Sequence, residues 1–172
     1  MRYNAVARML HWLTVALILT TILLGLVMVW VELPDPTKFT IYDIHQSIGV
    51  TLLLITLFRL VWRAGHPPPP LDPSIPPFMA FGAHASHFGL YALLIAMPVT
   101  GFLATNAWGF PLHLWWLVHL PDPIGRSERW APILSLAHDT MGFALIGLVA
   151  LHAGAALFHH FIRRDDTLRR ML

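Results

Sequence analysis

Two histidines, His138 and His152, stand fourteen residues apart in one long apolar stretch of the chain. Fourteen residues make close to four turns of an α-helix, so both imidazoles leave the same face, about 21 Å apart along the axis. That separation is about two-thirds of the hydrocarbon thickness of a bilayer, which is about 30 Å. A membrane helix with a neutral imidazole near each end is suited to hold two cofactors, one above the other, if other helices supply the opposing ligands.

The composition is that of a membrane protein. The 172 residues are 56% hydrophobic and only 12% charged, and the mean hydropathy is +0.63. A soluble domain carries about twice that share of charged residues. Four apolar runs are long enough to cross a bilayer, and we expect helices at roughly 10–31, 45–62, 84–105 and 132–160. The first run is too long for a signal peptide, and no small-residue cleavage site follows it. The sequence therefore predicts an all-α membrane protein, one four-helix bundle domain over residues 1–172.

The basic residues predict how the bundle is oriented. Eight of the eleven Lys and Arg residues lie at the two ends of the chain and in the second connection, whereas Lys38, Arg126 and Arg129 lie in the first and third connections. Cytoplasmic segments carry the excess of Lys and Arg, so we expect both termini in the cytoplasm. The isoelectric point near 9.5 then reflects topology and indicates no nucleic-acid partner. The sequence has no cysteine, which excludes thiolate-held iron–sulfur clusters and disulfides.

In this orientation the histidines fall at two depths. His45 and His138 belong to the outer end, and His11 and His152 to the inner end, where His87 is a rival partner for His152. Two facing neutral imidazoles are what a six-coordinate haem iron needs, and helix bundles build such sites from side chains on facing helices. The sequence therefore predicts two b-type haems.

Two other interpretations compete with haem. A single histidine in a membrane helix is often a packing residue that hydrogen-bonds to a neighbouring helix, but histidines at only two depths on four helices do not fit that explanation. Zinc favours three or four ligands at one centre. Pairs separated by about 21 Å along the bundle axis do not build such a centre.

The same interval of fourteen residues recurs on the other helices. Gly25, Arg59 and Gly101 each follow a histidine of the first three helices by fourteen residues. The glycines fall at the outer level, where they would let a porphyrin edge approach the backbone, although small residues also serve helix packing in membranes. Arg59 falls at the inner level, where it would pair with a haem propionate. The alternative is that its side chain extends to the membrane interface.

Several segments resemble one known family. They are Ala7-Arg8-Met9-Leu10-His11-Trp12, Ile44-His45-Gln46-Ser47-Ile48-Gly49, His84-Ala85-Ser86-His87, and the end of the chain over 151–172. All are similar to the bacterial cytochrome b561 family, and the similarity covers essentially the whole chain. It implies a four-helix di-haem b protein of the bacterial inner membrane that exchanges electrons with ubiquinone or menaquinone.

The resemblance also implies a ligand set and a direction. Helices one, two and four supply the ligands in the wider superfamily, which corresponds to His11, His45, His138 and His152 here. An outer donor would reduce the haem of His45 and His138, and the electron would pass inward to the second haem and then to quinone. His159, two turns after His152, is placed to hydrogen-bond a quinone carbonyl or relay a proton, and is otherwise an interfacial histidine.

A second candidate for the quinone site is His87, with His84 one turn away.

The electron donor stays open between two hypotheses. Oxidation of superoxide at the outer side is known within the family, and a positive surface would guide that anion. Lys38, Arg126 and Arg129 are the candidate residues for this role, but six acidic residues share their side of the bundle. The other hypothesis is a cytochrome b subunit that anchors a periplasmic dehydrogenase or a soluble cytochrome.

Overall fold

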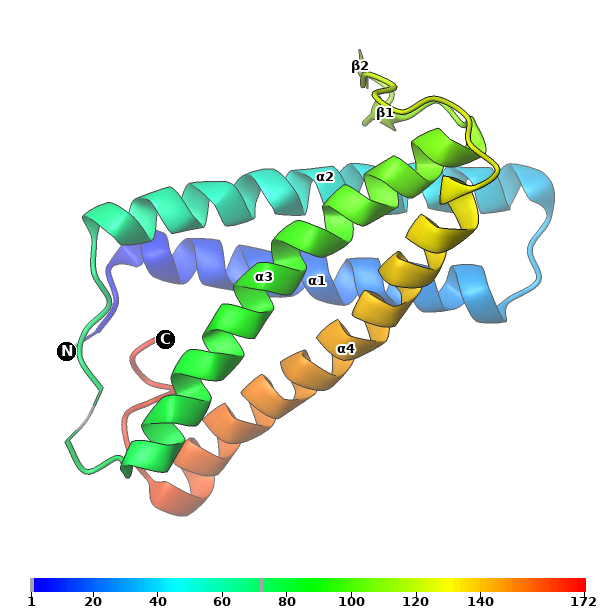
Figure 1. Ribbon diagram of the computed structural model, residues 1–172. Helices are drawn as coiled ribbons and strands as arrows, with labels where there is room; N and C mark the ends of the chain where they lie inside the picture. The colour runs from blue at the N-terminus through cyan, green and yellow to red at the C-terminus, as the bar shows by residue number, and fades with distance from the viewer. Residues whose placement is uncertain (1, 72) are drawn as a thin grey trace.

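The computed structural model describes residues 2–71 and 73–172. Four long helices dominate it: α1 (Ala5–Trp30), α2 (Asp35–Gly65), α3 (Pro77–Trp108) and α4 (Trp130–Phe158). A single π-helical turn, His159–Arg163, continues α4, and two short strands, β1 (His113–Leu114) and β2 (Val118–His119), pair antiparallel (Figure 1). All four helices are long and apolar enough to cross a membrane. The predicted four-helix membrane bundle is thus confirmed.

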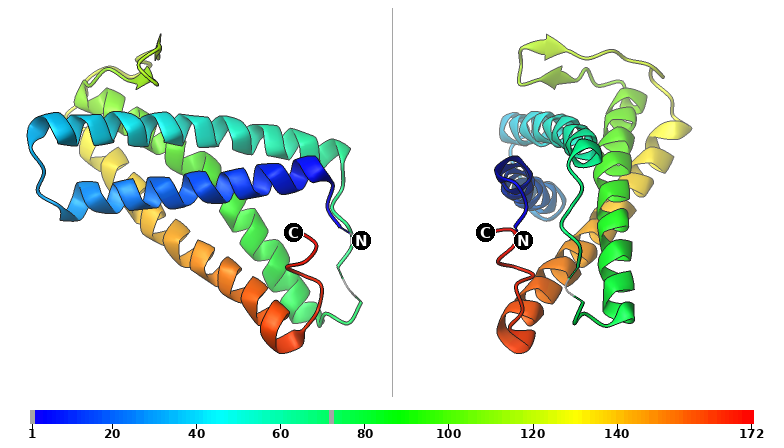
Figure 2. Two further views of the ribbon diagram at one scale, coloured as in Figure 1. Left: turned by 180° about the vertical axis from the view of Figure 1, so that it is seen from behind. Right: turned by 90° about the vertical axis from the view of Figure 1, so that its left-hand side faces the viewer.

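The helices form two antiparallel hairpins that cross at an angle. One hairpin is α1 with α2 and the other is α3 with α4 (Figure 1; Figure 2). The two termini and the connection between α2 and α3 lie at one end of the bundle, and the β1–β2 ribbon lies at the other. Successive helices along the chain therefore run in opposite directions, as the sequence predicts (Figure 1).

The helices extend beyond the apolar runs from which they were predicted. Asn4 caps α1 by accepting a hydrogen bond from the backbone N–H of Ala7 at 2.8 Å. α2 begins at Asp35 rather than near residue 45, and α3 begins at Pro77 rather than near 84. Both have a proline at the first or second helical position, where proline fits the first turn of a helix, so the polar turns outside the apolar run remain helical. Gly109, with φ of +80°, ends α3.

The buried core lies halfway along the bundle. Each helix contributes one aliphatic residue, and the four are Ile18, Leu52, Leu94 and Leu145. Each of them is seven residues, or about two helical turns, from a histidine of its own helix. A dry aliphatic layer therefore separates the two histidine levels.

The ribbon is fixed to α2 by two tryptophans. Trp115 and Trp116 adopt φ of +52° and +60°, a left-handed conformation that bulky residues rarely take. The backbone N–H of Trp115 donates to Ser47 Oγ at 2.9 Å, its indole donates to Thr51 Oγ1 at 3.1 Å, and the indole of Trp116 donates to Asp43 Oδ2 at 3.3 Å. These contacts hold the strained turn against the N-terminal part of α2.

The C-terminal tail packs back onto the other end of the bundle. The backbone N–H of Tyr3 donates to the carbonyl of Arg170 at 3.1 Å, and the indole of Trp12 donates to the carbonyl of Met171 at 2.9 Å. Arg170 reaches the carbonyl of Pro70 at 2.6 Å. The tail thereby joins α1 to the connection between the two hairpins.

Candidate functional site

His45 on α2 and His138 on α4 face each other near the ribbon end of the bundle. Their ring centroids are 6.2 Å apart and their planes are inclined at 78°. A metal bonded to an imidazole nitrogen at about 2 Å lies about 3 Å from the ring centre. Two ligands on opposite sides of one metal therefore place their ring centres about 6 Å apart, and this pair fits axial ligation of a haem iron.

The surroundings of His138 fix its orientation. Its Nδ1 lies 2.9 Å from the carbonyl oxygen of Met97. Because a carbonyl only accepts, Nδ1 carries the proton and Nε2 keeps the lone pair that a metal needs. Gly101, one turn after Met97, leaves room for this approach. A Cβ at residue 101 would lie 2.8 Å from the Nδ1 and Cε1 atoms of His138.

A glycine of α1 likewise lies against His45. The Nδ1 atom of His45 is buried and has no hydrogen-bond partner among the described residues. A Cβ on Gly25 of α1 would lie 3.5 Å from the Cε1 atom of His45. Both glycines of the fourteen-residue interval thus lie against histidine rings.

At the other end of the bundle, two histidines flank His152 of α4. Its ring centroid is 6.3 Å from that of His11 on α1 and 5.5 Å from that of His87 on α3. The first distance fits two ligands on opposite sides of one metal, and the second is shorter than that arrangement requires. His84, one turn before His87, is exposed.

Arg59 lies near His11 and His152. Its guanidinium is 5.6 Å from the ring centroid of Tyr91, close enough for a cation–π contact. A pocket at this end is lined by Arg59, Arg63, Tyr91 and Leu10, the residue before His11, among others. Two guanidinium groups in its lining make this pocket suitable for carboxylates.

His159 belongs to a compact group of polar residues that sequence reasoning did not find. Its Nδ1 lies 2.5 Å from Asp165 Oδ2, and both side chains are 13% exposed. The other carboxylate oxygen accepts the backbone N–H of Thr167 at 2.9 Å, and Arg163 Nε lies 3.3 Å from Oδ2. Burial alone would raise the pKa of Asp165, but hydrogen bonds from Thr167 and His159 outweigh it and hold this pKa well below its usual range.

The three basic residues at the ribbon end do not contact one another through any hydrogen bond or ion pair among the described residues. Arg126 is exposed and lies 4.0 Å from Glu128, and Arg129 lies over the ring of Trp130 at 5.6 Å. Lys38 is exposed in the first turn of α2. No hydrogen bond or ion pair between described side chains joins Lys38 to either arginine.

Comparison with known proteins identifies the family of the chain. The family model described as prokaryotic cytochrome b561 matches residues 2–172. Cytochrome b561 homolog 2 of Escherichia coli (strain K12) is 33% identical over 171 residues, which cover 99% of this chain and 91% of that protein. A protein of Yersinia pestis named probable superoxide oxidase CybB is 28% identical over 177 residues, covering 99% of this chain and 96% of that protein. The chain therefore belongs to the prokaryotic cytochrome b561 family of four-helix, haem-binding membrane proteins.

Proposed function

We propose that this protein binds two b-type haems and transfers electrons from a donor on the outer side of the bacterial inner membrane to ubiquinone or menaquinone near the cytoplasmic side. One observation carries the proposal: two histidine pairs, at opposite ends of the bundle, have ring centroids 6.2 and 6.3 Å apart. Both separations are those of two imidazoles on opposite sides of one metal. The excess of Lys and Arg at the end with the termini supports the orientation.

In this proposal His45 and His138 hold the outer haem, and His11 and His152 hold the inner one. The haems supply the one-electron chemistry when they are bound. The chain orients the ligands through groups such as the Met97 carbonyl, and it sets the potential by burial and by nearby charge. Arg59 supplies such a charge at the inner level, where we assign it to a propionate.

The inner end must also deliver protons, because reduction of a quinone to a quinol takes up two protons with two electrons. His159 is suited to this task. With Nδ1 bonded to Asp165, its Nε2 is the nitrogen that can exchange a proton or hydrogen-bond a quinone carbonyl. His87, with the exposed His84 one turn away, is the second candidate for contact with quinone.

Superoxide is the donor that we favour, because a relative is named a probable superoxide oxidase. Lys38, Arg126 and Arg129 would then attract the anion. A second candidate function is supported by the charge at the ribbon end, where six acidic residues outnumber these three basic residues. That balance suits a cytochrome b subunit that receives electrons from a periplasmic dehydrogenase or a soluble cytochrome.

Haem stoichiometry and rapid reduction kinetics test the proposal on purified, untagged holoprotein. The pyridine haemochrome assay should give two b haems per chain. Superoxide should reduce the haem rapidly when the two are mixed, and added quinone should reoxidise it. One haem per chain would overturn the two-haem arrangement, and haem that only a periplasmic protein fraction reduces would favour the subunit function.

A matched pair of variants tests the role of the outer charges. Replacing Lys38, Arg126 and Arg129 together by Gln should slow reduction by superoxide and weaken its dependence on ionic strength. Replacing Arg169, an exposed residue at the other end, by Gln should leave the rate unchanged. Equal rates in both variants would exclude electrostatic guidance by these three residues.

A further inference from the structure

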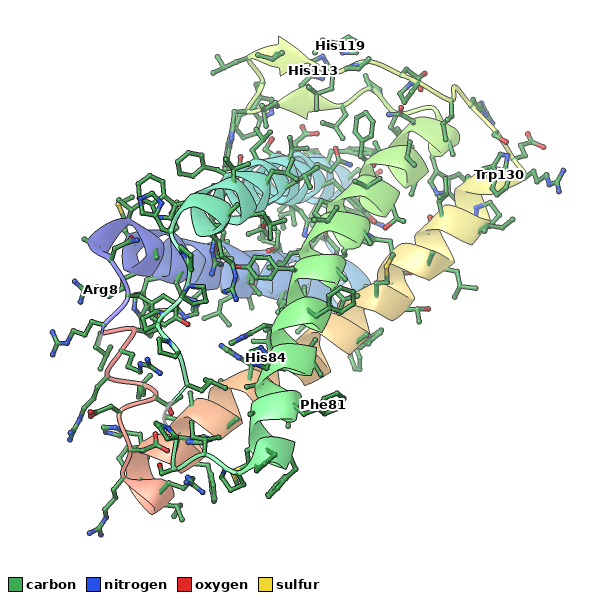
Figure 3. The ribbon with its side chains drawn as sticks, turned by 60° about the vertical axis from the view of Figure 1, so that its left-hand side comes forward. Arg8, Phe81, His84, His113, His119 and Trp130 are labelled. Carbon is green, nitrogen blue, oxygen red and sulfur yellow. The ribbon has the colours of Figure 1, made fainter. Side chains whose placement is uncertain are left out.

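We propose that His113 and His119 form a binding site for a divalent transition-metal cation, Zn²⁺ or one of similar chemistry, on the β1–β2 ribbon. The two residues are direct cross-strand partners in the antiparallel pair. Their ring centroids are 5.0 Å apart, and their planes are inclined at 48°. Both side chains are exposed and lie side by side above the bundle (Figure 3).

The separation of the rings distinguishes this pair from the histidine pairs inside the bundle. With each ring centre about 3 Å from a bound metal, ligands that subtend a tetrahedral angle have ring centres about 5 Å apart. Ligands on opposite sides of the metal have ring centres about 6 Å apart. The 5.0 Å of His113 and His119 fits the first arrangement, and the 6.2 Å of His45 and His138 fits the second.

The backbone that carries the two histidines is held in place before any metal binds. Between the strands, Trp115 is fixed to α2 through Ser47 and Thr51. Ser47 Oγ also lies 3.3 Å from the carbonyl oxygen of His113 itself. Ligands on an ordered backbone lose less conformational entropy on binding than ligands on a mobile loop.

A nearby carboxylate favours a cation at this site. Asp122 and His119 line one pocket, so a carboxylate lies close to one of the two proposed ligands. Negative charge at that point attracts a positive ion.

The ligand set defines the class of metal. Imidazole nitrogens suit Zn²⁺, Cu²⁺ and Ni²⁺, whereas Mg²⁺ and Ca²⁺ prefer oxygen ligands. In the described part of the chain no group of three or more His, Cys, Asp or Glu residues could hold a metal ion. Two protein ligands with water in the remaining positions make an exchangeable site rather than a permanent one.

Calorimetric titration of Zn²⁺ into the untagged holoprotein tests the site, and a histidine tag must be absent because it binds the same ions. We expect one Zn²⁺ per chain in the wild type and at least tenfold weaker binding in His113→Ala and in His119→Ala. His66→Ala is the matched control, since it removes another exposed histidine at the opposite end of the bundle, and its binding should equal that of the wild type. Mg²⁺ should give no binding heat in any of these proteins.

Copper spectroscopy separates loss of the site from loss of the fold. Each variant should keep the haem absorbance of the wild type. The electron paramagnetic resonance spectrum of one added Cu²⁺ should show two imidazole nitrogens in the wild type and one in either single variant. The proposal would be overturned if the wild type bound neither Zn²⁺ nor Cu²⁺. It would also be overturned if the double variant His113→Ala, His119→Ala bound these ions as well as the wild type. None of these readouts depends on electron transfer, so the metal site and the proposed function stand or fail separately.

Discussion

Gly101 of α3 lies so close to the ring of His138 that a methyl group on residue 101 would be 2.8 Å from both Nδ1 and Cε1 of the imidazole. The contact explains why a glycine stands there, because the ring must pass the helix surface to reach the carbonyl of Met97 at 2.9 Å. The backbone of α3 thus takes part in orienting a residue of α4.

We predict that Gly101→Ala displaces the ring of His138 and loses most of the outer haem. Adding a methyl group to a packed position costs about 1–3 kcal/mol, and here the strain falls on a proposed haem ligand. Gly25→Ala should have a milder effect, because its Cβ would meet His45 at 3.5 Å, an ordinary contact. Haem per polypeptide from the pyridine haemochrome assay measures both effects.

Gly147→Ala is the matched control, since a Cβ there would have no neighbour within 4 Å. It should keep two haems. A Gly101→Ala protein with full haem content and unchanged thermal stability would show that the ring accommodates the methyl group.

Variants of the histidines test the pairing. We expect His45→Ala and His138→Ala to lose the same haem, and His11→Ala and His152→Ala to lose the other, because our proposal assigns each pair to one metal. Low-temperature absorption spectra separate the two haems and show which one remains.

The variant His87→Ala decides between the two neighbours of His152. We expect it to keep both haems, because the 5.5 Å between the rings of His87 and His152 is shorter than opposed ligands require. Loss of the inner haem in His87→Ala, with retention in His11→Ala, would reverse the assignment.

Arg59 should raise the midpoint potential of the inner haem. A positive charge near the iron or a propionate stabilises the reduced, less positive state. Arg59→Gln should therefore lower this potential by tens of millivolts, and Arg59→Lys should restore part of the difference. Redox titration followed by visible absorbance measures the change, and equal potentials in all three proteins would place the guanidinium outside the influence of the haem.

The helical architecture was predictable because it is local. Apolar runs of sufficient length place four helices, and the position of each histidine within its run places two levels. The extents of the helices were not predictable in the same way. Polar turns such as the start of α2 at Asp35 lie outside the apolar run, and their helical state depends on proline position rather than hydropathy.

The details of the candidate site depend on contacts that sequence does not display. The Met97 carbonyl is a backbone group, so the identity of residue 97 does not indicate that it orients His138. The ribbon requires left-handed backbone at Trp115 and Trp116, which residue preferences disfavour. Asp165 meets His159 only because a π-helical turn and the left-handed residue Arg164 bring the tail back.

The contact between His159 and Asp165 provides a prediction about stability and pH. Asp165→Asn removes the charge that accepts hydrogen bonds from His159 and Thr167, each of which is a charge-assisted bond stronger than a neutral one. We expect a loss of about 1–3 kcal/mol at neutral pH and a decrease in Tm of several degrees for a chain of this size. Thermal unfolding of the detergent-solubilised protein measures it.

The pH dependence follows from the lowered pKa of Asp165 in the folded protein. A carboxylate whose pKa is lower when folded stabilises the protein above its unfolded pKa, about 3.9, and this contribution is lost as the pH falls toward the folded value. The Tm difference between the wild type and Asp165→Asn should therefore be full at pH 6–7, roughly two units or more above that unfolded pKa, and should shrink below about pH 4. Asp166→Asn is the matched control, because Asp166 is 73% exposed and pairs only with Arg169 at 3.5 Å among the described residues. It should change Tm little at any pH, and an equal decrease in both variants would assign the effect to the net charge of the tail rather than to the contact with His159.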